Sequence, residues 1–230
     1  MIRDHDTNRN AVENEPQRTA VLMSGGMDSA VLAADLANQG VRVSPVYVRF
    51  GLRWEDVELA YARRFLEALG HPSVDPLTVL ELPMGDVYGE HWSRTGPVPD
   101  EASPDEAVYL PGRNILLVSK VAVWCALRRI RTIHSGVLSG NPFPDATAEF
   151  FATLTRAISL GLDWSVEVIR PYAGRNKLDV IRIGREYPLE HTFSCLSPSG
   201  GGHCGRCNKC AERQKVFRDA GIADLTSYAR

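Results

Sequence analysis

Four cysteines lie within sixteen residues near the C-terminus, and this cluster restricts the fold more than any other feature of the sequence. Their spacing is Cys195-x8-Cys204-x2-Cys207-x2-Cys210. Four thiolates can close a tetrahedral Zn²⁺ site, and the intervening glycines let the loop wrap around an ion. Such a closed site has no open position for catalysis. The spacing therefore predicts a structural zinc that folds the C-terminal segment.

Other cysteine chemistries remain as alternatives to zinc. Disulfides are typical of secreted proteins, whereas the polar N-terminus carries no signal-peptide core. An iron–sulfur cluster uses similar ligands, and a redox-active CxxC pair does not require four cysteines so close together. We expect the neighbouring His203 to be solvated. Cys125 stands alone in an apolar stretch and is expected to be a core thiol.

Strand and helix patterns alternate along the chain, which predicts an α/β fold with a doubly wound, mostly parallel sheet. The expected strands are 19–23, 41–48, 74–82, 132–139 and 167–170. The expected helices are 28–39, 55–69, 114–129, 145–160, 177–186 and 211–220. Residues 1–18 are polar and are expected to form a disordered tail. Residues 19–190 form the expected α/β domain, with an irregular insertion at 85–109, and residues 191–230 form the zinc-binding segment.

Composition limits the function classes. The chain has 230 residues with 26 Lys+Arg against 28 Asp+Glu, a formal net charge of −2. Non-specific nucleic-acid binding usually requires a basic excess, so nucleic acid is not an expected partner. No apolar run approaches the roughly 20 residues that cross a bilayer. We therefore expect a cytoplasmic protein without a membrane contact.

A glycine-containing loop, Ser24-Gly25-Gly26-Met27-Asp28-Ser29, separates the first expected strand from the first helix. The glycines allow a tight turn, and the backbone amides with the positive end of the helix can cradle phosphate oxygens. Asp28 can bind Mg²⁺ or cap the helix. The loop is neither a Walker A nor a dinucleotide GxGxxG motif. An ordinary strand-to-helix turn is the alternative, but the whole hexapeptide in this context favours phosphate binding.

This hexapeptide resembles the SGGxDS signature of the PP-loop ATP pyrophosphatases, which have an adenine nucleotide alpha hydrolase-like fold. The resemblance implies that ATP adenylates an oxygen of the substrate and that pyrophosphate leaves into the loop. ATP with Mg²⁺ is then the expected nucleotide. The expected nucleotide contacts are Met23, Ser24, Gly25, Gly26, Met27, Asp28, Ser29 and Tyr47.

The loop and the cysteine cluster together resemble the 7-cyano-7-deazaguanine synthase family. The segments that agree are 110–114 (LPGRN), 143–145 (FPD) with 149–150 (EF), Lys177, and the zinc segment from Ser194. Two segments depart from the family pattern. This chain has FPDAT where the family usually has YPDCR, and FGLRW where the family usually has YGQxH. The resemblance implies a ligase that converts 7-carboxy-7-deazaguanine and ammonia to 7-cyano-7-deazaguanine through adenylated intermediates, in queuosine biosynthesis. It allows a homodimer.

Four further side chains are candidates for the reaction. Lys177 and Arg113 can neutralise ATP phosphates or the charge that develops on pyrophosphate, although each could also be a solvated surface cation. Asp145 can bind Mg²⁺ or a substrate N–H, or it can serve as an ordinary turn residue after Pro144. Tyr47 ends the second expected strand, where ligands of parallel sheets bind, so it can contact adenine or simply pack in the core. The predicted catalytic set is Asp28, Lys177, Arg113 and Asp145.

Two altered segments keep a second function open. A related PP-loop enzyme would adenylate a different carboxylate and then aminate or conjugate it. A tRNA-modifying thiolase is a further alternative, but a thiolase needs a free cysteine to carry sulfur, and only Cys125 lies outside the cluster. The intact Ser24–Ser29 loop opposes a nucleotide-binding module without activity.

Overall fold

The computed structural model describes residues 17–229 and contains one five-stranded parallel sheet. The strands are β1 (Arg18–Leu22), β2 (Arg42–Arg49), β3 (Thr78–Glu81), β4 (Thr132–His134) and β5 (Glu167–Ile169). The main helices are α1 (Met27–Asn38), α2 (Glu55–Leu69), α3 (Gly85–Tyr88), α4 (Arg113–Ala126), α5 (Ala148–Leu162), α6 (Lys177–Ile183) and α7 (Asn208–Ala220). Short 3₁₀ helices are η1 (Asp105–Val108), η2 (Pro144–Ala146), η3 (Gly184–Glu186) and η4 (Leu189–His191). The predicted α/β class is confirmed.

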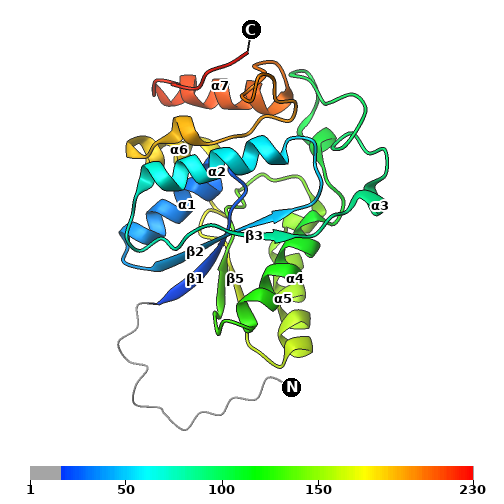
Figure 1. The fold of residues 1–230 in the computed structure, drawn as a ribbon, viewed down its shortest axis with the longest axis vertical. Coiled ribbons are helices and arrows are strands. Elements are labelled where there is room, and N and C mark those ends of the chain that lie inside the picture. The colour runs from blue at the N-terminus through cyan, green and yellow to red at the C-terminus, as the bar shows by residue number, and fades with distance from the viewer. Residues whose placement is uncertain (1–16, 230) are drawn as a thin grey trace.

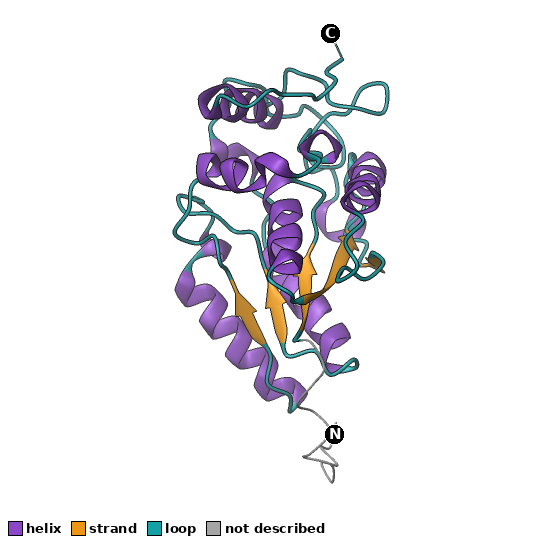
Figure 2. Ribbon diagram, turned by 90° about the vertical axis from the view of Figure 1, so that its left-hand side faces the viewer, coloured by secondary structure: helices purple, strands orange, loops and turns teal. Residues whose placement is uncertain are grey.

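The strand order β3-β2-β1-β4-β5 places a switch of chain direction between β1 and β4. The chain winds outward from β1 to β3, crosses over, and continues through β4 to β5. Neighbouring strand ends diverge at such a point, and ligands of open α/β sheets bind there, beyond the carboxyl ends. In Figure 2 the strands point toward the end of the molecule that holds the C-terminal segment.

Helices cover both faces of the sheet (Figure 1). One core cluster joins the sheet to α4 and α5 and includes Cys125, which is fully buried as predicted. A second cluster joins the sheet to α1, α6 and α7. The strands of such a sheet are covered on both faces, and accordingly residues 19–22 of β1 and 43–48 of β2 are all buried. The two clusters fix the strand ends from opposite sides.

Several predicted boundaries are wrong for identifiable reasons. The strand predicted at 132–139 ends at His134, because the chain then turns to line a cavity. The helix predicted from Asp145 begins at Ala148, where the Thr147 side chain accepts the Phe150 amide as an N-cap. The last helix begins at Asn208, three residues early.

The predicted tail and insertion are only partly as expected. Arg18 belongs to β1, and residues 1–16 lie outside the described part of the chain. The 85–109 segment is folded against the domain: it carries α3 and η1, and Trp92 stacks on Trp54 with ring centroids 5.6 Å apart. Asp100 forms an antiparallel bridge with Cys207. The segment therefore contacts the cysteine region directly.

Candidate functional site

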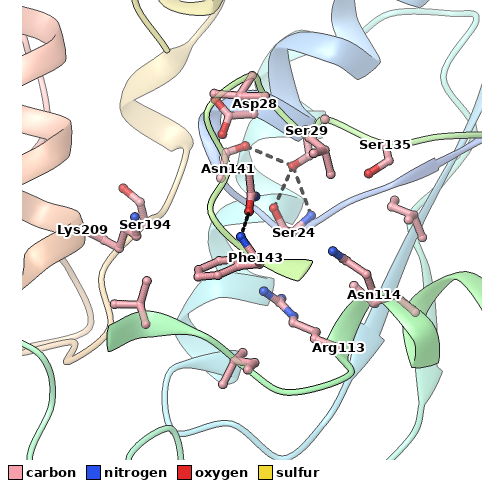
Figure 3. A pocket seen from close by; sticks show the side chains of 18 of the residues that line it. Ser24, Asp28, Ser29, Arg113, Asn114, Ser135, Asn141, Phe143, Ser194 and Lys209 are labelled. Carbon is pink, nitrogen blue, oxygen red and sulfur yellow. Dashed lines mark hydrogen bonds between the residues drawn. The ribbon is translucent and has the colours of Figure 1, made fainter. Parts of the chain in front are cut away.

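A cavity of about 450 Å³ lies beyond the carboxyl ends of β1, β2 and β4. Its walls include the loop after β1, the end of β2, the starts of α2, α4 and α6, the turn after β4, the 85–109 segment and the C-terminal segment. Figure 3 shows side chains of these parts around one space, with Arg113 and Asn114 from α4 and Ser194 and Lys209 from the C-terminal segment. The topology therefore places the candidate site at the direction switch of the sheet.

The loop after β1 is held by its own hydrogen bonds. The Ser24 amide donates to Ser29 Oγ over 3.1 Å, and the two serine hydroxyls lie 3.1 Å apart. Ser29 Oγ in turn donates to the Gly26 carbonyl over 3.1 Å. The loop closes directly into the first turn of α1, whose leading amides have no intrahelical acceptors. An anion at this end of α1 also meets the positive end of the helix dipole.

Gly25 has a backbone that other residues adopt poorly, with φ of +72°. A Cβ at this position would lie 2.9 Å from the Glu58 carbonyl oxygen. The Gly25 carbonyl accepts the Phe193 amide over 2.7 Å. The first glycine of the motif is thus required by φ and by close packing, and it ties the loop to the C-terminal segment.

Asp28 and Lys177 meet at the start of α1. Lys177 Nζ lies 2.9 Å from Asp28 Oδ2, whereas Asp28 Oδ1 is buried without a partner among the described residues. Burial lowers the pKa of Lys177, but the Asp28 and Glu212 carboxylates outweigh it and hold the pKa above its ordinary value. Lys177 is therefore a cation. A buried carboxylate oxygen without a partner beside a phosphate loop fits a Mg²⁺ ion, which prefers oxygen ligands.

A chain of ion pairs continues from Lys177 to the C-terminal segment. Glu212 on α7 lies 3.7 Å from Lys177 Nζ and 3.0 Å from Lys209 Nζ. Lys209 also lies 3.5 Å from Asp105 in η1. All of these residues line the cavity. The network joins the phosphate loop, α7 and the 85–109 segment around one space.

Tyr47 and Glu58 form a buried polar pair on the cavity wall. The Tyr47 hydroxyl donates to Glu58 Oε2 over 2.5 Å. Burial raises the pKa of Glu58 to about 7, and burial with the neighbouring Glu58 carboxylate raises the pKa of Tyr47. No cation lies within 4.0 Å of Glu58 among the described residues. The predicted Tyr47 is therefore at the site, accompanied by an acid that the sequence analysis did not identify.

Asp145 lies away from the cavity walls. It is buried, and its Oδ2 accepts the Asn114 backbone amide over 3.0 Å, while its carbonyl accepts Asn114 Nδ2 over 2.8 Å. These bonds satisfy the first turn of α4. Arg113, the neighbour of Asn114, lines the cavity. Asp145 is thus placed to hold the helix that presents Arg113, and its predicted catalytic role stays a prediction.

Of the remaining predicted nucleotide contacts, some line the cavity and others lie away from it. Met23, Ser24, Gly26, Asp28 and Ser29 line the cavity. Gly25 and Met27 do not: Gly25 packs on Glu58, and Met27 is buried in the second core cluster.

The four cysteines converge as the spacing predicted. All are buried, and their sulfur atoms lie within 4.8 Å of one another. The Cys204 and Cys210 sulfurs are 4.0 Å apart, and those of Cys195 and Cys207 are 3.9 Å apart. Zn–S bonds of 2.3 Å in a tetrahedron give S···S separations of about 3.8 Å. The amides of Ser197 and Cys204 donate to Cys195 Sγ. The cluster therefore fits a tetrahedral metal ion.

The expectation that His203 is solvated is wrong. Its ring is fully buried between Phe193, Tyr61 and Tyr228, and its Nε2 accepts the Ser194 amide over 3.3 Å. Burial lowers the pKa of His203 to about 4. The histidine is therefore a neutral core residue that positions the chain just before Cys195.

Among the cavity residues that the sequence analysis did not predict as site residues are Glu58, Ser194, Lys209 and Glu212. Glu58 has the spacing of a helix residue and no motif of its own. The other three lie close to the cysteines in the sequence. There they have the character of loop or surface residues, and only the packing of the cysteine segment against the Ser24–Ser29 loop brings them to the cavity. Arg213 completes that docking: it is buried and donates to Thr192 Oγ1 and the Leu189 carbonyl, each over 2.8 Å.

Comparison with known proteins decides the family. The model of the family "Queuosine biosynthesis protein QueC" matches residues 18–221. The chain belongs to the QueC family. A QueC relative, the 7-cyano-7-deazaguanine synthase of Solidesulfovibrio magneticus, is 30% identical over 93% of this chain and 96% of its own length. The synthase of Methanothermobacter thermautotrophicus is also 30% identical, over 92% of this chain and 99% of its own.

Among solved structures, a 4-thiouridine synthetase in complex with RNA and ATP is similar with a TM-score of 0.52 and 16% identity. The similarity covers 89% of this QueC-family chain and 50% of the synthetase. At this identity the likeness supports the fold alone. No helix within residues 17–229 has the length and apolar character needed to cross a membrane.

Proposed function

We propose that this chain is an ATP-dependent ligase that converts 7-carboxy-7-deazaguanine and ammonia to 7-cyano-7-deazaguanine. One observation carries the proposal: the Ser24–Ser29 loop and the segment that begins the four-cysteine centre, with Cys195, border the same cavity in a chain of the QueC family. The division proposed from the sequence is kept, with an ATP-binding domain at 19–190 and a metal-binding segment at 191–230.

The cavity residues suit the first activation. The substrate carboxylate attacks the α-phosphorus of ATP, and pyrophosphate leaves. The Ser24–Ser29 loop, the start of α1 and the Lys177 cation offer the donors and the positive charge that the leaving pyrophosphate needs. Asp28 would hold Mg²⁺ through Oδ1, and the ion would neutralise phosphate charge. Ammonia then adds to the acyl carbon, and AMP leaves to give the amide.

The second activation uses the same groups. The amide oxygen attacks the α-phosphorus of a second ATP and pyrophosphate leaves; loss of AMP and of the two amide N–H protons then gives the nitrile. Cys195, Cys204, Cys207 and Cys210 would hold Zn²⁺ as a closed structural ion, which stabilises the wall that carries Ser194 and Lys209. The residues of this chain therefore bind, orient and compensate charge.

Assembly and location complete the proposal. A homodimer is supported by large apolar side chains that are exposed on α4, directly after it and on α5: Ile115, Val123, Leu127 and Leu160. Free ammonia is the proposed nitrogen source, and the cytoplasm, which supplies ATP, is the proposed location.

A second candidate is a related enzyme that activates another carboxylate. Trp54 favours it, because this indole lines the cavity where the family resemblance places a histidine.

The test is a product assay. Purified protein is incubated with ATP, Mg²⁺, ammonium and 7-carboxy-7-deazaguanine, and AMP and nitrile are followed by mass spectrometry. We expect two AMP per nitrile, and Lys177→Met is expected to lower kcat/KM by roughly 100-fold or more. AMP release with another carboxylate and none with this substrate would support the second candidate instead.

A further inference from the structure

Three cations line the cavity, and they differ in how their charge is compensated. Lys177 is paired with Asp28 and Glu212. Lys209 is paired with Glu212 and Asp105. Arg113 has no carboxylate within 4.0 Å among residues 17–229, and its Nε is buried without a hydrogen-bond partner. A buried guanidinium N–H without an acceptor costs free energy until a ligand supplies one.

The backbone around Arg113 is fixed even though its side chain lacks a partner. The residue begins α4 directly after Gly112, whose φ is +73°. The next residue, Asn114, is bonded to Asp145 through both its backbone and its side chain. In Figure 3 the guanidinium extends from α4 into the space between the walls. Arg113 is therefore held in position for a ligand and not for a neighbouring side chain.

A second donor in the cavity also lacks a partner. Ser194 Oγ is buried and makes no hydrogen bond to the described residues. The backbone of Ser194 is fixed on both sides, because its amide donates to His203 and the next residue is the metal ligand Cys195. Within residues 17–229, five buried side-chain polar atoms have no partner; Asp28, Arg113 and Ser194 hold three of them, and all three residues line this one cavity.

The reaction brings two anions into the cavity. The Ser24–Ser29 loop, the start of α1 and Lys177 offer amide and hydroxyl donors and a positive charge for the triphosphate. The other anion is the carboxylate of the acceptor. Arginine suits it best, because a guanidinium can donate two parallel N–H bonds to a carboxylate.

We propose that Arg113 and Ser194 bind the carboxylate of the acceptor substrate; this inference rests on the proposed function. It reassigns Arg113, which the sequence analysis grouped with the phosphate ligands. The Arg113 charge lowers the pKa of Glu58 against the larger effect of burial. The two side chains form no ion pair within 4.0 Å among residues 17–229, and Glu58 Oε2 accepts the Tyr47 hydroxyl. The site thereby distinguishes a carboxylate acceptor from the neutral amide and nitrile that follow it.

The test compares ligands that differ only in charge. Binding of 7-carboxy-7-deazaguanine and of its neutral carboxamide is measured by calorimetry, with the non-hydrolysable α,β-methylene ATP present. The wild-type protein is expected to prefer the carboxylate about 10- to 100-fold, as a charge-assisted pair predicts. Arg113→Gln is expected to abolish this preference and to leave affinity for the ATP analogue within about twofold. Arg113→Lys is expected to retain part of the preference.

Matched controls lie on the same elements. Arg128→Gln removes an exposed arginine just beyond the other end of α4 and is expected to change neither affinity. Ser194→Ala is expected to weaken carboxylate binding about 5- to 10-fold, whereas Ser197→Ala, two residues beyond Cys195 and outside this cavity, is expected to have no effect. Thermal unfolding with the metal bound checks that each variant is folded.

The outcomes separate the inference from the function. If Arg113→Gln lost affinity for the ATP analogue and for the carboxylate equally, Arg113 would be a phosphate ligand and the inference would be overturned. Nitrile formation by the wild-type protein would still support the proposed function. An unchanged carboxylate preference in Arg113→Gln and Ser194→Ala would also overturn it. A wild-type protein that binds neither ligand and forms no nitrile would overturn both proposals.

Discussion

The Ser24–Ser29 loop and the four-cysteine segment border one cavity, but they keep their shapes by different means. The loop is held by serine hydroxyl bonds and by the first turn of α1. The cysteine segment between residues 195 and 207 has no helix, and its only described backbone pairings are isolated bridges. Its centre is four sulfurs about 4 Å apart. A loop of the first kind keeps its shape without a ligand, whereas we expect a segment of the second kind to depend on the proposed metal ion.

Metal removal is the strongest test of this difference. Cys207→Ser is expected to lose the zinc and several kcal/mol of unfolding free energy, because binding a structural zinc contributes about 10–16 kcal/mol to small zinc domains. Metal analysis and urea unfolding measure both effects. Cys125→Ala, a change at a buried thiol outside the cluster, should keep one zinc per chain. A Cys207→Ser protein that stays folded and metal-loaded would contradict the structural role.

The loop is tested by an alanine at Gly25, with Gly40→Ala as its partner. Both glycines have positive φ, +72° and +82°, so each alanine should cost about 1 kcal/mol of stability. Only at Gly25 would the Cβ meet a backbone atom, 2.9 Å away, whereas Gly40 has nothing within 4 Å. We expect Gly25→Ala alone to lower ATP affinity, by more than about tenfold. Equal ATP affinities in the two variants would mean that the loop can shift to accommodate the Cβ without weakening ATP binding.

Glu58, which packs behind the loop, gives an effect that depends on pH. Its pKa is raised to about 7 by burial, so the folded protein holds a proton there between pH 4.5 and 7 that the unfolded chain releases. Wild-type stability therefore falls as pH rises through this window, by at most about 3 kcal/mol. Glu58→Gln has no carboxyl group to titrate at this position. Its free energy of unfolding should therefore rise relative to that of wild type as pH increases from 5 to 8.

Urea unfolding at pH 5 and pH 8 measures this gain. Glu67→Gln, at an exposed position of the same helix, should show no such trend. A pH-independent difference between Glu58→Gln and wild type would show that Glu58 is ionised in the fold at both pH values.

The sequence predicted those parts of the molecule whose signals are local. The alternation of patterns predicted the sheet, and α2 was predicted at its observed bounds. The loop and the cysteine spacing are each defined within a few residues, so the metal cluster was found without knowledge of the fold. The class of the protein followed from these two motifs.

What the sequence did not predict depends on contacts between distant segments. Whether Glu58 is buried depends on α2 packing against Gly25, 33 residues earlier in the chain. Ser194 and Lys209 became cavity residues only because Arg213 docks α7 onto the domain. Asp145 stood in a motif, yet its carboxylate is directed at the α4 backbone. Residue type and spacing do not reveal which of two neighbouring elements a polar side chain will face.

The order of elements along the chain has a consequence for biosynthesis. All five strands are complete at Ile169, whereas the first metal ligand is Cys195. During synthesis, therefore, every strand of the sheet leaves the ribosome before any of the four cysteines, and N-terminal parts fold first. Scarcity of zinc would act on a chain whose sheet and phosphate loop already exist. Such a chain would lack only the last wall of its cavity, and later delivery of the ion would complete it.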